Sequence, residues 1–166
     1  YSSIRKKKES YSKQNYSIIF FSFFFFRKMT IVCVSGYFDP IHVGHLEYFR
    51  HAKELGTSLV VIVNNDEQAR QKKGKAFMKD VERVEIVDSL KMVDHVILSI
   101  DKDRTVRETL ASMDPKPDIF CNGGDQFNDI IPEREICEKH GIQLVDGLGL
   151  KIQSSSSLIR ESREQS

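Results

Sequence analysis

Short runs of β-branched and apolar residues alternate along this chain with longer stretches in which apolar residues recur at helical spacing. This alternation is typical of β-α-β units, in which helices join parallel strands. The expected strands are residues 31–35, 59–63, 96–100, 119–121 and 142–145. Because 166 residues suffice for one hydrophobic core, the pattern predicts an α/β fold with a single domain and a doubly wound parallel sheet of five strands.

Helices are expected between these strands, each with a start or stop signal. The first helix carries Leu46, Phe49, Ala52 and Leu55 and ends at Gly56. The second begins at Asp80 and has Val81, Val84, Val87 and Leu90 on one face, and the third begins at the capping-box pattern of Thr105 and Glu108. Pro132 suits the start of a fourth helix that ends at His140-Gly141, and Ser154 to Ser157 opens the last one. Residues 64–79 are polar and are expected to form a long loop, which usually has a function.

The first 28 residues differ from the rest of the chain in composition. They hold seven basic residues and one acidic residue, followed from residue 18 by a Phe-rich run that is too short to span a bilayer. No small-residue cleavage site follows this run. We therefore expect residues 1–28 to be a non-native or disordered extension and residues 29–163 to form the domain. An interfacial membrane anchor is the alternative for the extension, although the sequence as a whole argues against membrane association.

The remaining residues give no sign of a nucleic-acid partner. They carry 18 basic and 23 acidic residues, so the domain lacks the basic footprint that a polynucleotide would require. The three cysteines are odd in number and form no C-x-x-C pair, which argues against a disulfide framework and against structural zinc. A reducing compartment, the cytoplasm, is expected.

The turn between the first strand and the first helix carries the clearest chemistry. It runs from Gly36 to His45, and ligands of an open parallel sheet bind at such a turn. Gly44 would let the backbone approach a phosphate, and the helix N-terminus offers N–H groups and a positive dipole end. His42 and His45 can donate hydrogen bonds to phosphoryl oxygens as charge builds during displacement at phosphorus. Two histidines supply only two metal ligands, so no metal site is predicted.

The pattern G-x-F-D-x-x-H-x-G-H resembles the signature of the cytidylyltransferase-like branch of the nucleotidylyltransferase superfamily, which includes glycerol-3-phosphate cytidylyltransferases. Further matching segments follow in the order that this family shows: Ala52–Gly56, Val63–Glu67, Lys72–Lys75, Glu82-Arg83, Val93-Asp94 and Gly124-Asp125. The resemblance covers Met29 to Arg160. It implies a Rossmann-like fold, and since dimers are common in the family it leaves a homodimer open.

The resemblance also implies a reaction and a set of roles. A substrate phosphate would attack the α-phosphorus of a nucleoside triphosphate and release pyrophosphate, with Mg²⁺ on the triphosphate as cofactor. Catalysis would rest on His42, His45 and Lys75, the lysine having Lys72 or Lys73 nearby. Lys72 and Arg83 would bind the acceptor, with Arg83 on the polar side of its helix. Nucleotide binding would fall to Gly36, Tyr37, Phe38, Asp39, Gly44, Asp125, Ser154, Ser155, Ser156 and Ser157.

The identity of the nucleotide stays open at this point. Members specific for CTP usually carry Arg-Thr-x-Gly before the hydroxyl cluster, whereas this chain has Leu148 to Gln153 there. Asp39-Pro40 and Asn122 to Asp125 are similar to adenylyl-transferring relatives, including those that activate heptose 1-phosphate. The first expectation is transfer of CMP from CTP to a small phosphorylated alcohol or polyol. The second is AMP transfer from ATP to a sugar phosphate or an FMN-type acceptor, and the third is a non-catalytic nucleotide-binding module.

Overall fold

The computed structural model describes residues 29–123, 131–148 and 154–164. The strands within these ranges are β1 (Ile31–Gly36), β2 (Ser58–Val63), β3 (His95–Leu98), β4 (Ile119–Gly123) and β5 (Gln143–Leu148). They form one sheet in the order β3-β2-β1-β4-β5, and every pairing is parallel. The predicted α/β doubly wound sheet is confirmed. Its order reverses between β1 and β4, which is where such sheets bind ligands.

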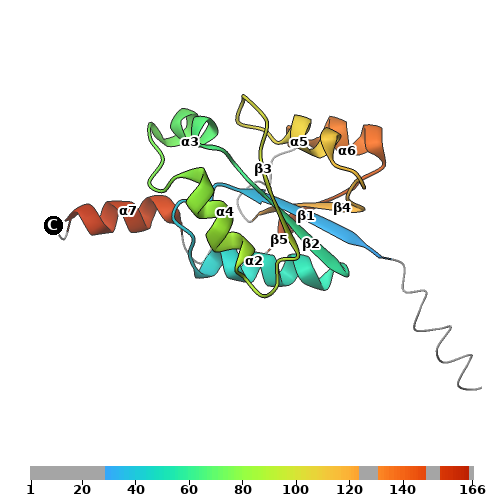
Figure 1. The fold of residues 1–166 in the computed structure, drawn as a ribbon, viewed down its shortest axis with the longest axis horizontal. Coiled ribbons are helices and arrows are strands. Elements are labelled where there is room, and N and C mark those ends of the chain that lie inside the picture. Colours follow the sequence, from blue (N-terminus) through green and yellow to red (C-terminus); the bar gives the residue numbers. More distant parts are fainter. Residues whose placement is uncertain (1–28, 124–130, 149–153, 165–166) are drawn as a thin grey trace, which may run out of the picture.

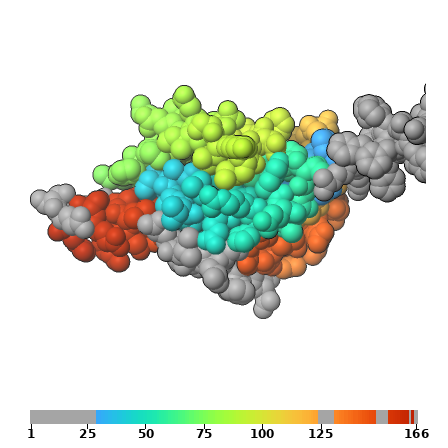
Figure 2. Space-filling model, turned by 90° about the horizontal axis from the view of Figure 1, so that it is seen from below, coloured from blue at the N-terminus to red at the C-terminus, as the bar shows by residue number. Residues whose placement is uncertain are grey.

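Helices cover both faces of this sheet (Figure 1). One face carries α2 (Val43–Glu54) and α4 (Asp80–Asp88), and the other carries α5 (Arg107–Ser112) and α6 (Arg134–His140). Figure 2 shows α2 in the middle of its face, between α4 and β5. The helices α3 (Asp66–Lys73) and α7 (Ser155–Glu164) lie at the carboxyl end of the strands.

The two faces have separate cores because successive side chains of β1 point in opposite directions. Val32 and Val34 pack with residues of α2 and α4, including Phe49. Ile31 and Cys33 pack with residues on the side of α5 and α6. A strand buried on both sides is apolar throughout, which is why the central strands could be found from the sequence.

The expectation of a loop over residues 64–79 is wrong, because α3 forms within it. The backbone N–H of Gln68 donates to the Asn65 side chain at 2.9 Å, and the N–H of Asn65 donates to the Gln68 side-chain oxygen at 2.9 Å. This reciprocal pair is a capping box. The helix ends at Gly74, which has a positive φ of 84°.

Three helix starts or faces also differ from the expectation. Val81 is 62% exposed, and α4 ends at Asp88 before it reaches Leu90. The start of α5 is capped by the buried carboxylate of Asp101, which accepts from the N–H groups of Glu108 and Thr109, while Thr105 bonds to Asp103 instead. Pro132 precedes α6 by two positions, since the helix begins at Arg134. At α5 the contact with Asp101, and not the local capping pattern, decides where the helix begins.

No helix of the described residues is both long enough and apolar enough to cross a bilayer. Residues 1–28 lie outside the described residues, so the expectations for the extension and for the domain boundary at residue 29 stay predictions.

The end of β1 has no room for a side chain. A Cβ on Gly36 would lie 2.6 Å from the ring atom Cζ of buried Phe38. We predict that Gly36→Ala lowers the free energy of unfolding by about 1–3 kcal/mol through overpacking, measured by urea denaturation. Gly123→Ala is the control, because a Cβ there meets Tyr48 at an ordinary 3.6 Å and should change stability by less than about 0.5 kcal/mol. Equal stability of Gly36→Ala and the wild type would contradict the packing argument.

Candidate active site

The turn after β1 is built on a buried aromatic ring. Phe38 adopts a positive φ of 49° and is 1% exposed. Its ring lies edge-on to His45, with centroids 5.0 Å apart, and to Phe49, with centroids 5.1 Å apart. The ring of Phe38 therefore supports the ring of His45, and the nucleotide-binding role expected of Phe38 stays a prediction.

The two histidines of the turn lie against each other at the start of α2. His42 is the N-cap residue, and its ring stacks on that of His45 with centroids 3.7 Å apart and an interplanar angle of 19°. The backbone N–H of His42 donates to Nδ1 of His45 at 3.2 Å. An Nδ1 that accepts a hydrogen bond in a neutral ring leaves the proton on Nε2. His45 therefore presents Nε2–H as a donor.

Both imidazoles are neutral near pH 7. Burial, followed by the neighbouring His42 and Lys73, lowers the pKa of His45 to about 3. Burial and then Lys73 also lower the pKa of His42. Among the side chains that the structure describes, Nδ1 of His42 is the buried nitrogen or oxygen without a hydrogen-bond partner. A buried polar atom of this kind is expected to be satisfied by a ligand.

The start of α2 adds backbone donors to the pair. Val43 and Gly44 are its first two residues, and their N–H groups have no partner within a helix. These groups and the positive end of the helix dipole attract an anion. The structure thus places Gly44 beside the histidines, as the sequence predicted.

The C-terminal serines reach the same turn from far along the chain. Ser155, the first residue of α7, donates from its hydroxyl to the carbonyl of Pro40 at 2.8 Å. The Ser154 hydroxyl accepts from the N–H of Ser157 at 3.2 Å, which confirms the predicted helix start. A second helix N-terminus therefore lies against the turn that holds the histidines. The nucleotide contacts expected of Ser154 to Ser157 stay predictions.

Asp39 is buried in the protein and does not face a ligand. Its carboxylate is 0% exposed and accepts hydrogen bonds from the backbone N–H groups of Phe77 at 2.9 Å and Met78 at 2.8 Å. The Asp39 carboxylate thus holds the segment before α4 against the turn that carries the histidines. The nucleotide-binding role expected of Asp39 stays a prediction.

The lysine beside the histidines is Lys73. Its Nζ donates to the carbonyl of Asp39 at 2.6 Å and lies 3.8 Å from the Asp39 carboxylate. Burial is the largest influence on its pKa and lowers it. Lys75, the residue expected from the resemblance, is exposed beyond the end of α3. Had Asn65 and Gln68 been recognised as a capping box, the sequence would have predicted α3. Lys73 would then lie one helical turn after the buried Ala69.

Tyr37 and Lys72 form the outer edge of this region. The Nζ atom of Lys72 lies 4.2 Å from the centre of the Tyr37 ring, a cation–π geometry. Burial, opposed by a hydrogen bond with Arg104, raises the pKa of the Tyr37 hydroxyl, so it stays protonated at pH 7. The binding roles expected of Tyr37 and Lys72 stay predictions, and Asp125 lies outside the described residues.

Arg83 is not on the polar side of its helix. It is 0% exposed and is the largest fully buried side chain of the described residues. Its guanidinium donates to three backbone carbonyls and to the carboxylate of Asp66. This corrects the expected position of Arg83 on the polar side of its helix, while its expected role in binding the acceptor stays a prediction.

The family is decided by a match over most of the chain. Residues 33–162 match the family described as Cytidylyltransferase-like. The chain belongs to this family. The resemblance inferred from the sequence is thereby confirmed, and with it the Rossmann-like fold.

Individual relatives agree with the family. The bifunctional protein HldE of Citrifermentans bemidjiense is 37% identical over 130 residues, which make up 73% of this chain and 26% of HldE. The FAD synthase of Thermococcus kodakarensis is 38% identical over 117 residues, or 70% of this chain and 76% of the synthase. The crystal structure of a lipopolysaccharide core biosynthesis protein from Thermoplasma volcanium has a TM-score of 0.62 at 32% identity, covering 73% of this chain and 98% of that protein. The chain spans about a quarter of the HldE proteins.

The partly buried, neutral His45 makes the protein sensitive to acid. The folded state holds the pKa of His45 below its unfolded value, so the unfolded state binds more protons as the pH falls below about 6.5, and stability is lost. We predict that His45→Gln removes about 2 kcal/mol of the stability loss between pH 7 and pH 5, measured by urea denaturation. His51→Gln, at a side chain that is 45% exposed on the same helix, should keep the wild-type loss. Equal acid sensitivity in all three proteins would show that His45 is not the group responsible.

Proposed function

We propose that this nucleotidyltransferase transfers an adenylyl group from ATP to the phosphate of a small acceptor, either a sugar phosphate or an FMN-type molecule, and releases pyrophosphate. The relatives favour this second sequence expectation over CMP transfer from CTP. Four of the relatives at 34–38% identity are FAD synthases or HldE proteins, and an enzyme that makes FAD handles an adenine nucleotide. The Thermoplasma volcanium relative is a lipopolysaccharide core biosynthesis protein, which favours a sugar acceptor.

The stacked, neutral histidine pair at the start of α2 carries the chemical part of the proposal. In the reaction, an oxygen of the acceptor's phosphate forms a bond to the α-phosphorus, and the bond from that phosphorus to the bridging oxygen of the β-phosphate breaks. Negative charge grows on the oxygens around the α-phosphorus and on the leaving pyrophosphate. The Nε2–H of His45 would donate a hydrogen bond to these oxygens, because the neutral ring carries its proton on Nε2.

Lys73 and the two helix N-termini would hold the rest of the triphosphate. The Lys73 ammonium lies close enough to both histidines to lower their pKa values. Phosphate oxygens that bind between them would be contacted from both sides. The first N–H groups of α2 and of α7, with the serines at the start of α7, suit the β- and γ-phosphates, because the first N–H groups of a helix have no partner within it.

Mg²⁺ would arrive with the triphosphate as part of the substrate. The described residues contain no group of three or more His, Cys, Asp or Glu side chains that could hold a metal ion. The ion would therefore rely on phosphate oxygens and water for most of its ligands, which is usual for Mg²⁺ bound with nucleotides.

The cysteine thiols bear on the cellular compartment proposed for the enzyme. Cys33, Cys121 and Cys137 are free and buried. Burial is the main influence that raises the pKa of Cys121 to about 12 and that of Cys137 to about 11, so neither is a ready thiolate. This supports a reducing compartment, with the cytoplasm first. A homodimer remains the alternative to a monomer.

A pyrophosphate-release screen separates the candidate reactions. ATP and CTP are each tested with heptose 1-phosphate, FMN, glycerol phosphate and ethanolamine phosphate. We predict that ATP with a sugar phosphate or FMN gives at least about tenfold more turnover than CTP with any acceptor. Turnover with CTP alone would restore CMP transfer as the function. Tight nucleotide binding without pyrophosphate release would favour a non-catalytic binding module.

Lys73 and Lys75 give a direct test of which lysine takes part in catalysis. We predict that Lys73→Met lowers kcat on the order of 10²-fold, as expected when a charged donor to the transition state is lost. Lys75→Met is the matched control two residues away, and it should change kcat less than about threefold because an exposed charge is screened by solvent. A larger loss for Lys75→Met than for Lys73→Met would return the catalytic role to Lys75.

A further inference from the structure

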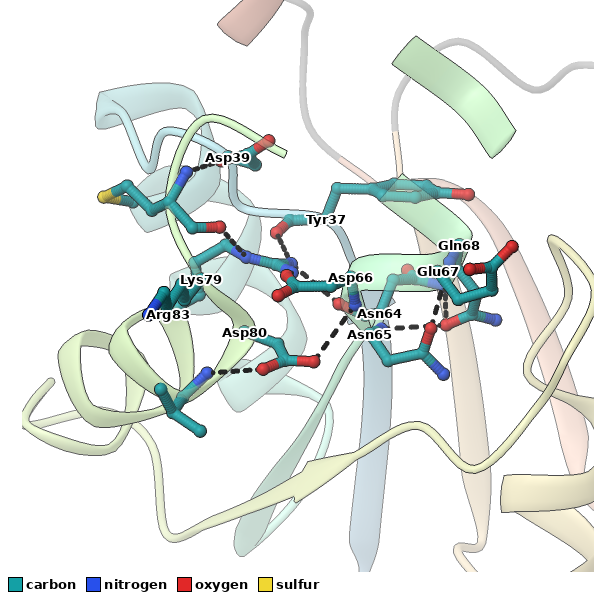
Figure 3. A network of polar contacts seen from close by, with 12 residues as sticks. Tyr37, Asp39, Asn64, Asn65, Asp66, Glu67, Gln68, Lys79, Asp80 and Arg83 are labelled. Carbon is teal, nitrogen blue, oxygen red and sulfur yellow. Dashed lines mark hydrogen bonds and ion pairs between the residues drawn. The ribbon is translucent and has the colours of Figure 1, made fainter. Parts of the chain in front are cut away.

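Arg83 joins three segments of the chain from inside the protein, through three backbone carbonyls and one carboxylate. Nε donates to the carbonyl of Met78 at 3.1 Å, and Nη1 donates to the carbonyls of Tyr37 and Asn64, both at 2.7 Å. Nη2 donates to Oδ1 of Asp66 at 2.8 Å. Figure 3 shows the guanidinium enclosed by these acceptors. A buried charge is tolerated when it is paired and its hydrogen bonds are satisfied, and four of the five N–H groups of Arg83 are used in this way.

The acceptors lie at the ends of the elements that form the site. Tyr37 follows β1 and begins the turn that leads to the histidines, and Asn64 follows β2. Asp66 is the first residue of α3, the helix that ends at Lys73. Arg83 therefore contacts both the segment that carries the histidines and the segment that carries the lysine.

Two further contacts join α4 and the segment before it to the start of α3 and to the turn after β1. The N–H of Asp66 donates to the Asp80 carboxylate at 3.0 Å, a second link between α4 and the start of α3. The N–H of Met78 donates to Asp39 at 2.8 Å, while the Met78 carbonyl accepts from Arg83. The peptide groups of Met78 thus connect the two fully buried charges, Asp39 and Arg83.

We propose that Arg83 is a positioning residue: its guanidinium fixes α3 relative to the catalytic turn, so that Lys73 and the histidine pair meet the same phosphates. Lysine cannot replace the planar guanidinium fork of Arg83. The four acceptors lie around the edge of the guanidinium in several directions, and the compact ammonium of lysine cannot reach them all. The consequence for turnover rests on the proposed function, but the consequence for the fold of the two segments does not.

Amide hydrogen exchange of the protein without substrates tests the structural part. Arg83→Lys keeps the charge and removes the fork. We expect exchange to become at least about tenfold faster over residues 37–45 and 64–79, with the β4 and α6 amides unchanged. Arg70→Lys on the exposed side of α3 is the control and should leave both segments at the wild-type rate. Unchanged exchange in Arg83→Lys would overturn the proposal, whatever the activity of the enzyme.

Steady-state kinetics of pyrophosphate release then distinguish positioning from acceptor binding. A positioning residue predicts a loss of kcat on the order of 10²-fold in Arg83→Lys with KM for the acceptor changed less than about threefold. A phosphate ligand predicts the opposite: a raised KM, a nearly unchanged kcat and wild-type exchange rates. If the wild type itself releases no pyrophosphate, the proposed function fails while the exchange result still decides the role of Arg83.

A milder variant covers the case in which Arg83→Lys does not fold. Asp66→Ala removes one of the four acceptors at a side chain that is 30% exposed. We expect faster exchange at the start of α3 and a loss of kcat of about tenfold, with the turn at residues 37–45 affected less. Wild-type exchange throughout α3 in this variant would count against the proposal.

Discussion

Two buried charges of opposite sign hold the site end of the sheet together. Neither the Asp39 carboxylate nor the Arg83 guanidinium touches solvent, and each is satisfied mainly by backbone groups of other segments. Leaving one such charge without its partners costs several kcal/mol, so the segments that supply the partners are strongly held in place. The turn, the end of β2 and the start of α3 are ordered by this requirement together with the apolar packing of Phe38 and Val63.

The site combines this rigidity with an unusual state of its histidines. A partly buried, neutral His45 packs against the Phe38 ring, and its Nε2 proton is fixed by the hydrogen bond that Nδ1 accepts from the backbone. Preorganised donors of this kind need no rearrangement when charge develops on a phosphate. Two helix N-termini approach the same turn, so the anionic substrate meets donors that were already oriented by folding.

The sequence predicted the sheet, the start of α2 and the start of α7 in outline, because these depend on local periodicity and on a short motif. It could not predict the burial of Asp39 and Arg83. Their partners come from residues 37 to 78, and neither charge follows an apolar pattern. The helix α3 was missed because it buries little apolar surface, with Ala69 as its buried apolar residue. Lys73 was missed with it, since the choice between neighbouring lysines depends on which face of that helix turns inward.

The backbone and the side chain of Tyr37 belong to different parts of the site. Its carbonyl belongs to the buried network, whereas its ring and the neighbouring Lys72 lie at the edge of the protein. A substitution of the side chain leaves the carbonyl and its bond to Arg83 in place. The surface at this edge can therefore change its chemistry while the bond that holds the turn to Arg83 is kept.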